Sequence, residues 1–343
     1  MSSIADSSTV SAVGPPLARA DQQAADVRYG GVWLTGLVAA LAWFAATAFI
    51  AWWPGQAMVA DSTYLLRLTT IVALVLLGIS LAGSRIPTVL NAIDQAGPWF
   101  IALAVGLILW EAVTAKFGLL PRPFFSAPQG ILNVYFQDFP KLSESLLHSV
   151  RLLAIGFFVG AVTGFLTGIA IGWWKVAGYW LHPLLRFIGP LPATAWLPIA
   201  FFIFPTSFAA STFLVALASA VPVTILTWSG VAGVNKDYFD IARTMGASQN
   251  FLVWKVAVPA ALPHVFVGLF MGLGASFAVL VVAEMLGVKA GLGWYLQWAQ
   301  GWAAYDNMYA ALLLMAFMCS SLVTLLFAVR DRTLSWQKEL VRW

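Results

Sequence analysis

The longest stretch without a charged side chain runs from Phe187 to Asn235 and reads FIGPLPATAWLPIAFFIFPTSFAASTFLVALASAVPVTILTWSGVAGVN. It is more than twice as long as the roughly 20 apolar residues that a helix needs to cross a bilayer. Its first half contains four prolines, at Pro190, Pro192, Pro198 and Pro205. Because proline interrupts helices, we expect two membrane helices, over about 187–204 and 208–232, joined by a short turn near Pro205 and Thr206.

The rest of the chain has the same apolar character. Hydrophobic residues make up 61% of its 343 residues and charged residues only 9%, against about 45–50% and about 25% in soluble domains. Six more stretches are long and apolar enough to span a membrane: 31–53, 64–83, 98–117, 148–172, 262–286 and 307–329. The sequence therefore predicts an all-α, polytopic helical membrane protein with about 8 transmembrane helices.

The first 28 residues are different in composition. They are rich in Ser, Ala and Gln and show no apolar periodicity, which predicts a disordered tail over 1–28. Asp6 stands where a signal peptide carries basic residues, and the first apolar stretch is late and long. We therefore expect a cytoplasmic tail and no cleaved signal peptide.

The basic residues form no run, so the net charge of +4 favours membrane orientation over nucleic-acid binding. Cytoplasmic loops of membrane proteins carry an excess of Lys and Arg. If both termini are cytoplasmic, 12 of the 18 basic residues fall on the cytoplasmic side. This asymmetry predicts a multi-pass protein with both termini cytoplasmic, whose surroundings are the lipid bilayer and which has no nucleic-acid partner.

The metal-binding residue types are sparse. Cys319 is the only cysteine, which excludes a disulfide or a thiolate cluster within one chain. The three histidines lie far apart and match no common ligand spacing. We expect no metal site and a packing role for Cys319.

A glycine recurs every four residues in the fourth apolar stretch, at Gly156, Gly160, Gly164, Gly168 and Gly172. This spacing places the glycines along one side of a helix, where another helix can approach backbone to backbone. Close static packing is one interpretation. Another is a smooth surface on which helices slide during transport, and for this reason Gly164 and Gly168 are candidate pathway residues.

One polar segment, 235–259, interrupts the apolar pattern on the predicted cytoplasmic side. Asn235 can cap a short helix, and Gly246 can end it in the left-handed conformation. Ser248 can cap a second short helix before Pro259 and Pro263. An exposed helical corner of this kind suits docking into a partner's groove, with Phe239, Ala242 and Met245 as anchors.

This segment resembles the cytoplasmic signature of a known family, which reads Glu-Ala-Ala, three residues, Gly, nine residues, Ile-x-Leu-Pro. The chain keeps the spacing with Asp240-Ile241-Ala242, then Gly246, then Val256-Ala257-Val258-Pro259. Further matching stretches are Leu191–Pro198, Val282–Gly287 and Gly291–Gly293. The chain is similar to the permease subunits of bacterial ATP-binding cassette (ABC) importers, in the nitrate, sulfonate, taurine and bicarbonate branch.

The resemblance implies a permease core over 98–343, with six membrane helices, and two extra N-terminal helices over 29–97. It also implies that a coupling helix contacts the ATPase subunits through these residues: Asp240, Ile241, Ala242, Arg243, Met245, Gly246, Ala247 and Pro259. ATP and Mg would then bind to the partner ATPase and not to this chain. The turn Phe204–Phe208 departs from the branch's usual Trp-Phe-Gly-x-Gly pattern.

The implied assembly is an importer in the bacterial inner (cytoplasmic) membrane. It contains two ABC ATPase subunits, a second permease copy, most simply as a homodimer, and a periplasmic or lipid-anchored substrate-binding protein. The solute is small and polar, as are oxyanions such as nitrate, sulfonates including taurine, and bicarbonate.

Charged residues within or beside the predicted spans include Arg67, Glu111, Arg151 and Glu284. A charge at the bilayer centre costs about 2.5–3.5 kcal/mol on insertion scales, so such residues are candidates for a transport pathway. Arg67 and Arg151 can also snorkel to the interface. Glu284 is the strongest candidate because it lies in a family-like stretch, and Arg151 is the second.

Enzymatic motifs are absent from the sequence. No Gly-Lys pair exists, so the chain lacks the phosphate-binding loop of an ATPase, and it has no nucleophile elbow or zinc-protease motif. We expect a transport subunit and not an enzyme. The alternatives are a secondary transporter or channel without an ATPase, which predicts repeats and broken helices, and a membrane scaffold or sensor.

Overall fold

The computed structural model describes residues 33–53, 55, 60–82, 93–120 and 123–337. The predicted tail over 1–28 lies outside these residues. Helices and turns make up the described chain, which contains no strand, so the all-α prediction is confirmed. Two compact units divide at Asn133 and Val134. The sequence-based division into tail, extra helices and core stays a prediction, because compactness alone does not define a permease core.

The first unit is built from three apolar helices: α2 (Leu34–Trp52), α3 (Thr63–Leu81) and α5 (Gly97–Glu111). A 3-10 turn, η2 (Asp94–Ala96), precedes α5, and a π-helical turn, η3 (Ala112–Lys116), extends it. Small and apolar side chains such as Ala39, Ala40 and Leu76 form the core between α2 and α3. Helix α6 (Pro128–Gln137) crosses the division between the units.

A buried ion pair completes the first unit. Lys116 Nζ lies 3.6 Å from Glu111 Oε1, and both side chains are nearly inaccessible to solvent. Lys116 also donates to the carbonyl oxygens of Ile50 (3.2 Å) and Trp53, at the end of α2. These contacts stabilise the two charges and tie the end of α5–η3 to the end of α2, because the last carbonyls of a helix lack partners within it. Glu111 therefore forms part of a structural ion pair in the first unit.

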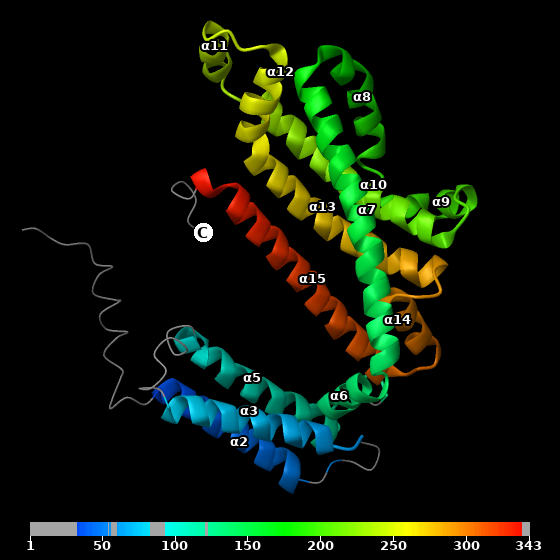
Figure 1. The fold of residues 1–343 in the computed structure, drawn as a ribbon. Helices are drawn as coiled ribbons and strands as arrows, with labels where there is room; N and C mark the ends of the chain where they lie inside the picture. Colours follow the sequence, from blue (N-terminus) through cyan, green and yellow to red (C-terminus); the bar gives the residue numbers. More distant parts are fainter. Residues whose placement is uncertain (1–32, 54, 56–59, 83–92, 121–122, 338–343) are drawn as a thin grey trace, which may run out of the picture. The chain divides into compact units, whose positions relative to one another are not determined.

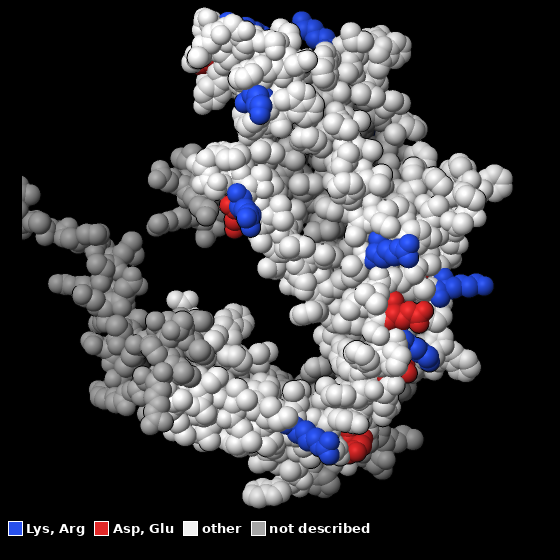
Figure 2. All heavy atoms as spheres, in the orientation of Figure 1, with Lys and Arg blue, Asp and Glu red and all other residues white. Residues whose placement is uncertain are grey.

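The second unit contains all the remaining helices (Figure 1). In chain order they are α7 (Phe139–Trp173), α8 (Lys175–Ile188), the 3-10 turn η4 (Ala193–Trp196), α9 (Leu197–Ile203), α10 (Ser207–Ala232), α11 (Lys236–Thr244), α12 (Gln249–Phe251), the π-helix η5 (Leu252–Ala257), α13 (Val258–Gly287), α14 (Leu292–Gly301), α15 (Tyr305–Thr333) and the 3-10 turn η6 (Ser335–Gln337). The apolar composition is visible on the face in Figure 2, where Lys, Arg, Asp and Glu cover only small, separated areas.

Seven helices among the described residues are long and apolar enough to cross a membrane, and a bent pair gives an eighth span if it counts as one. The predicted count of about eight is thus confirmed. The turn at Pro205 and Thr206 is also confirmed, because the Thr206 hydroxyl accepts from Ala209 N (3.2 Å) and caps α10. Two short helices, α6 and α14, were not predicted.

One predicted helix is wrong. The stretch 187–204 is not a single helix: its first two residues end α8, and the rest forms η4 and α9 after a bend of 89°. The physical reason is the sequence Gly189-Pro190-Leu191-Pro192, in which two prolines cannot donate helical hydrogen bonds. The second short helix, predicted after Ser248, is also not separate from the membrane helix that follows it. Pro259 and Pro263 do not interrupt the helical segment Gln249–Gly287.

Helix α10 packs between α7 and α13 at backbone distance. The glycine stripe of α7 faces α10: a Cβ atom at Gly160 would lie 2.3 Å from Ala216 O, and one at Gly164 would lie 2.6 Å from Ala220 O. Gly272 of α13 lies against Ser219 of α10 on the other side. The predicted close helix approach is confirmed by these distances. Any larger side chain on these faces would push the helices apart.

Replacement of Gly160 tests this packing. We expect Gly160→Val to lower the stability of the purified protein by about 1–3 kcal/mol or more, because the new side chain meets backbone atoms that cannot move aside. The matched control is Gly274→Val on α13, where an added Cβ meets nothing within 4 Å. The measurement is the thermal unfolding midpoint in detergent. Equal midpoints for the two variants would contradict the packing account.

Candidate functional site

The predicted coupling segment forms an exposed helical corner at one end of the second unit, where Figure 1 shows α11 and α12. Asn235 caps α11, since its side-chain oxygen accepts from Asp237 N at 3.0 Å. Ser248 caps α12, since its hydroxyl accepts from Phe251 N at 3.4 Å. The caps that the sequence predicted are therefore present.

Gly246 turns the chain between these two helices. Its φ is +80°, in the left-handed region that side chains other than glycine disfavour. Gly246 N donates to Arg243 O (2.9 Å), and Ala247 N donates to Ala242 O (3.0 Å), which satisfies carbonyls at the end of α11. The corner is thus a defined turn, as the sequence predicted.

Five large apolar side chains are exposed on this corner: Tyr238, Ile241, Met245, Phe251 and Trp254. We call them the coupling surface. Met245 is 83% exposed and Ile241 is 60% exposed. Large apolar side chains that gather on a short polar helix are typical of a protein docking surface.

One predicted docking anchor is wrong. Phe239 does not face outward but packs edge-on against Trp173 of α7, with ring centroids 5.5 Å apart. It joins the apolar cluster that contains Val231, Val253 and Ala257. The sequence period placed Phe239 and Ala242 on one face of α11, but this face lies toward the body of the unit. Tyr238, Ile241 and Met245, at the same helical spacing, form the outer face instead.

The charged residues on α11 are also exposed. Arg243 Nη1 lies 3.3 Å from Asp240 Oδ1, one turn apart on the helix surface. Such pairs are worth little on their own, so Asp240 and Arg243 remain available to a partner. Pro259 lies in the first turn of α13. The coupling role of Asp240, Arg243, Pro259 and the other predicted residues stays a prediction.

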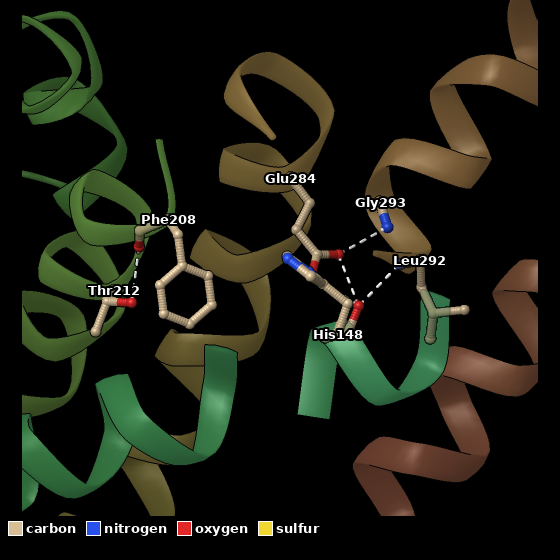
Figure 3. Close-up of polar contacts among 7 residues, drawn as sticks. His148, Phe208, Thr212, Glu284, Leu292 and Gly293 are labelled. Atoms are coloured by element: carbon tan, nitrogen blue, oxygen red, sulfur yellow. Dashed lines mark hydrogen bonds and ion pairs between the residues drawn. The ribbon is translucent and has the colours of Figure 1, made fainter. Parts of the chain in front are cut away.

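A second polar site surrounds Glu284, close to the end of α13 (Figure 3). The Glu284 side chain is fully buried. The Ser149 hydroxyl of α7 donates to its carboxylate, at 2.7 Å from Oε1 and 2.8 Å from Oε2. Gly293 N donates to Oε2 at 2.9 Å, and His148 Nδ1 lies 3.8 Å from Oε1. One carboxylate therefore joins α7, α13 and α14.

The local backbone is shaped to admit this carboxylate. Gly291 has φ of +110°, and a Cβ atom there would lie 2.3 Å from Glu284 Cδ. Leu292 N donates to the Ser149 oxygen at 2.8 Å, so two backbone donors at the start of α14 are satisfied. The positive end of the helix dipole also favours a carboxylate at this position. Glu284 thus holds the first turn of α14.

A separate polar cluster also holds the first turn of α14, through Tyr295. The Tyr295 hydroxyl donates to Asp138 Oδ2 (2.9 Å), and Asn307 Nδ2 donates to the same oxygen (2.9 Å). Burial raises the pKa of Tyr295, which keeps the phenol protonated as a donor. No sequence signal predicts this cluster, because Asp138 lies 157 positions before Tyr295 and 169 positions before Asn307, and the three residues share no motif.

The other candidate pathway residues lie in different environments. Arg151 is exposed, and its guanidinium carbon lies 5.7 Å from the centre of the Phe208 ring. Gly164 and Gly168 are buried against α10. Arg151 therefore lies near the Glu284 site, because its guanidinium and the His148 ring both contact Phe208, whereas the two glycines lie farther along α7. The pathway role of all four residues stays a prediction. Among the described residues, no group of His, Cys, Asp and Glu could hold a metal ion.

Comparisons with known proteins show a family match and several relatives. The family described as "Binding-protein-dependent transport system inner membrane component" matches residues 156–334, which include the coupling segment and Glu284. The chain is 30% identical to the nitrate import permease protein NrtB of Synechocystis sp., over 70% of this chain and 87% of that protein. It is 32% identical to the bicarbonate transport system permease protein CmpB of Synechococcus elongatus, over 69% and 85%.

A likeness to solved structures is also found. A chain of the MetNI methionine ABC transporter, in an inward-facing conformation, superposes with a TM-score of 0.48 at 19% identity. The match covers 60% of this chain and 98% of that chain.

Removal of the Glu284 carboxylate tests its role as an anchor for α14. We expect Glu284→Ala to leave Gly293 N–H and the Ser149 hydroxyl without their acceptor, at about 1–3 kcal/mol for each buried donor. Hydrogen exchange of residues 288–301 should therefore become faster, while that of α11 stays unchanged. The control is Ser276→Ala, which removes one buried, neutral hydrogen bond of 3.3 Å from the same helix. Unchanged exchange in α14 would contradict the anchor.

Proposed function

Because this chain belongs to the family of binding-protein-dependent transport system inner membrane components, we propose that its coupling surface docks into ABC ATPase subunits. The chain is the membrane-spanning translocation subunit of an ATP-driven importer. Its family implies ATPase and substrate-binding partners. The observation that carries the docking proposal is the gathering of exposed apolar side chains, Ile241 and Met245 above all, on a polar corner.

The connections of the coupling corner to the long helices of the unit allow it to transmit movement. Phe239 and Trp173 fix α11 to the end of α7, while Gly246 joins it to the segment Gln249–Gly287. At 1.5 Å per residue, this helical segment of 39 residues is on the order of 55–60 Å long and ends beside Glu284. A push on the coupling surface would therefore reach the opposite end of the unit through one helix, and through Glu284 it would reach α14.

The proposed assembly follows from one coupling surface per chain. Two ATPase subunits need two such surfaces, which a homodimer of this chain supplies. ATP and Mg bind to the ATPase subunits, which places hydrolysis outside this chain. This arrangement puts the coupling surface and both termini in the cytoplasm and the protein in the bacterial inner membrane. A periplasmic or lipid-anchored binding protein delivers the solute at the end of the unit that contains α14.

We propose a small oxyanion as the solute. Some of the relatives are described as nitrate and bicarbonate permeases, which supports this class. The alternative is a secondary transporter or channel without an ATPase. The broken helix pair α8 and α9 is a feature of many secondary transporters. Such a protein, however, has no ATPase subunit to which an exposed coupling surface could bind.

Introduction of a charged side chain into the coupling surface tests whether this surface docks into the ATPase. We expect Ile241→Glu to reduce the amount of ABC ATPase that copurifies with the tagged chain by at least about tenfold, since a buried, unpaired carboxylate costs several kcal/mol in an apolar contact. The control is Gln300→Glu, an exposed position on α14 at the other end of the unit, which should retain the ATPase.

The wild-type result also discriminates between the candidate functions. Copurification of an ATPase that both variants retain equally would show that the partner docks elsewhere. Absence of any ATPase from the wild-type preparation would instead favour the secondary transporter.

A further inference from the structure

The break between α8 and α9 exposes a proline-rich stretch of backbone, and the packing of the unit does not explain this exposure. Helix α8 ends at Ile188, four residues that belong to no helix follow, and η4 and α9 continue at 89° to α8. Pro190, Leu191 and Pro192 in this break are all exposed on the surface of the chain. The break lies within the charge-free stretch of the sequence, where lipid contact is expected.

Contacts along α8 place the break beside the midpoint of α10, a helix long and apolar enough to span the membrane. Near the start of α8, Gly178 lies against Ile171, close to the end of α7. One turn later, His182 packs on Trp228, with ring centroids 4.7 Å apart. At the break, a Cβ atom on Gly189 would contact Val221, which is close to the midpoint of α10 (Ser207–Ala232). Helix α8 therefore descends along α10 and stops halfway.

The break leaves backbone acceptors free. Gly189 N donates to Leu185 O (2.8 Å), and Leu191 N donates to Ile188 O (3.1 Å). Within the described part of the chain, no hydrogen bond reaches the carbonyl oxygens of Gly189, Pro190 and Leu191. Pro190 and Pro192 have no N–H, so this turn presents acceptors and almost no donors.

Lipid cannot satisfy these carbonyls. Each unpaired backbone group in the hydrocarbon region costs several kcal/mol, and irregular backbone is found at membrane depth only where it is buried in protein or faces a water-filled cavity. Pro190, Leu191 and Pro192 are exposed in the chain, so its own helices do not bury them. Either water or a second protein chain must cover them.

We propose that the Gly189–Pro192 break lines the water-filled solute pathway of the importer. This inference rests on the proposed function, because only a transport subunit requires water at this depth. Hydration water then satisfies the free carbonyls, and the pathway has a wall of hydrogen-bond acceptors at mid-membrane. Such a wall interacts with the hydration shell of an anion, or with its O–H or N–H groups, and does not bind a bare oxyanion tightly.

Thiol accessibility tests the proposal. In a Cys319→Ser background, Leu191→Cys is placed in the break, and the complex with the ATPase and binding protein is treated in membrane vesicles with a charged, membrane-impermeant methanethiosulfonate. The thiolate forms only in water, so we expect Leu191→Cys to react at least about tenfold faster than a cysteine at Phe158. Phe158 is the control, since it is an exposed apolar residue within the uninterrupted helix α7. We also expect the reaction to block solute uptake.

A second variant keeps the test informative if Leu191→Cys does not assemble. Ala195→Cys lies on the exposed side of η4, directly after the break, and should react in the same way. Slow reaction of both variants in a complex that still imports solute would overturn the pathway proposal and leave the proposed function intact. Spontaneous disulfide formation between two copies, without reagent access, would show that a second chain covers the break and would also overturn it. Absence of ATP-driven uptake in the complex with the unsubstituted chain would instead count against the proposed function.

Discussion

The close contact of α10 with α7 on one side and α13 on the other is the constraint on which the second unit depends. In a lipid environment no hydrophobic effect drives helices together, so their association rests on van der Waals contact and hydrogen bonds. The glycines of both neighbours allow α10 to approach their backbones, as at Gly160 beside Ala216 and Gly272 beside Ser219. The coupling surface, the Glu284 site and the α8–α9 break are all positioned by elements that pack on, or continue from, these three helices.

This arrangement connects the two ends of the unit. The coupling corner is continuous with α13, and α13 ends at the carboxylate that holds α14. The glycine contacts offer smooth surfaces, whereas Glu284, Ser149 and Gly293 form a buried polar connection that strongly favours one geometry. A movement that begins at α11 is therefore expected to displace α13 along the glycine faces and to carry α14 with it.

The sequence predicted the elements that depend on local patterns. Apolar length identified the long spans, four-residue glycine spacing identified the α7–α10 contact, and caps at Asn235 and Ser248 identified the coupling corner. Prediction from the sequence failed where contacts between distant parts of the chain determine the position of a side chain. Phe239 turned inward because Trp173 lies beside it, and the partners of Glu284 and Asp138 come from distant helices. The break after Gly189 was not predicted, because the prolines of this stretch were all assigned to a single turn near Pro205, and the contact of Gly189 with Val221 of α10 shows its depth.

Solute uptake in proteoliposomes that contain this chain, its ABC ATPase and its binding protein distinguishes an ATP-driven importer from an ion-coupled transporter. We expect uptake of a small oxyanion, with nitrate and bicarbonate as the first solutes to try, that requires hydrolysable ATP and continues when ionophores collapse the ion gradients. Uptake that proceeds without ATP and stops when the gradients are collapsed would instead identify an ion-coupled transporter.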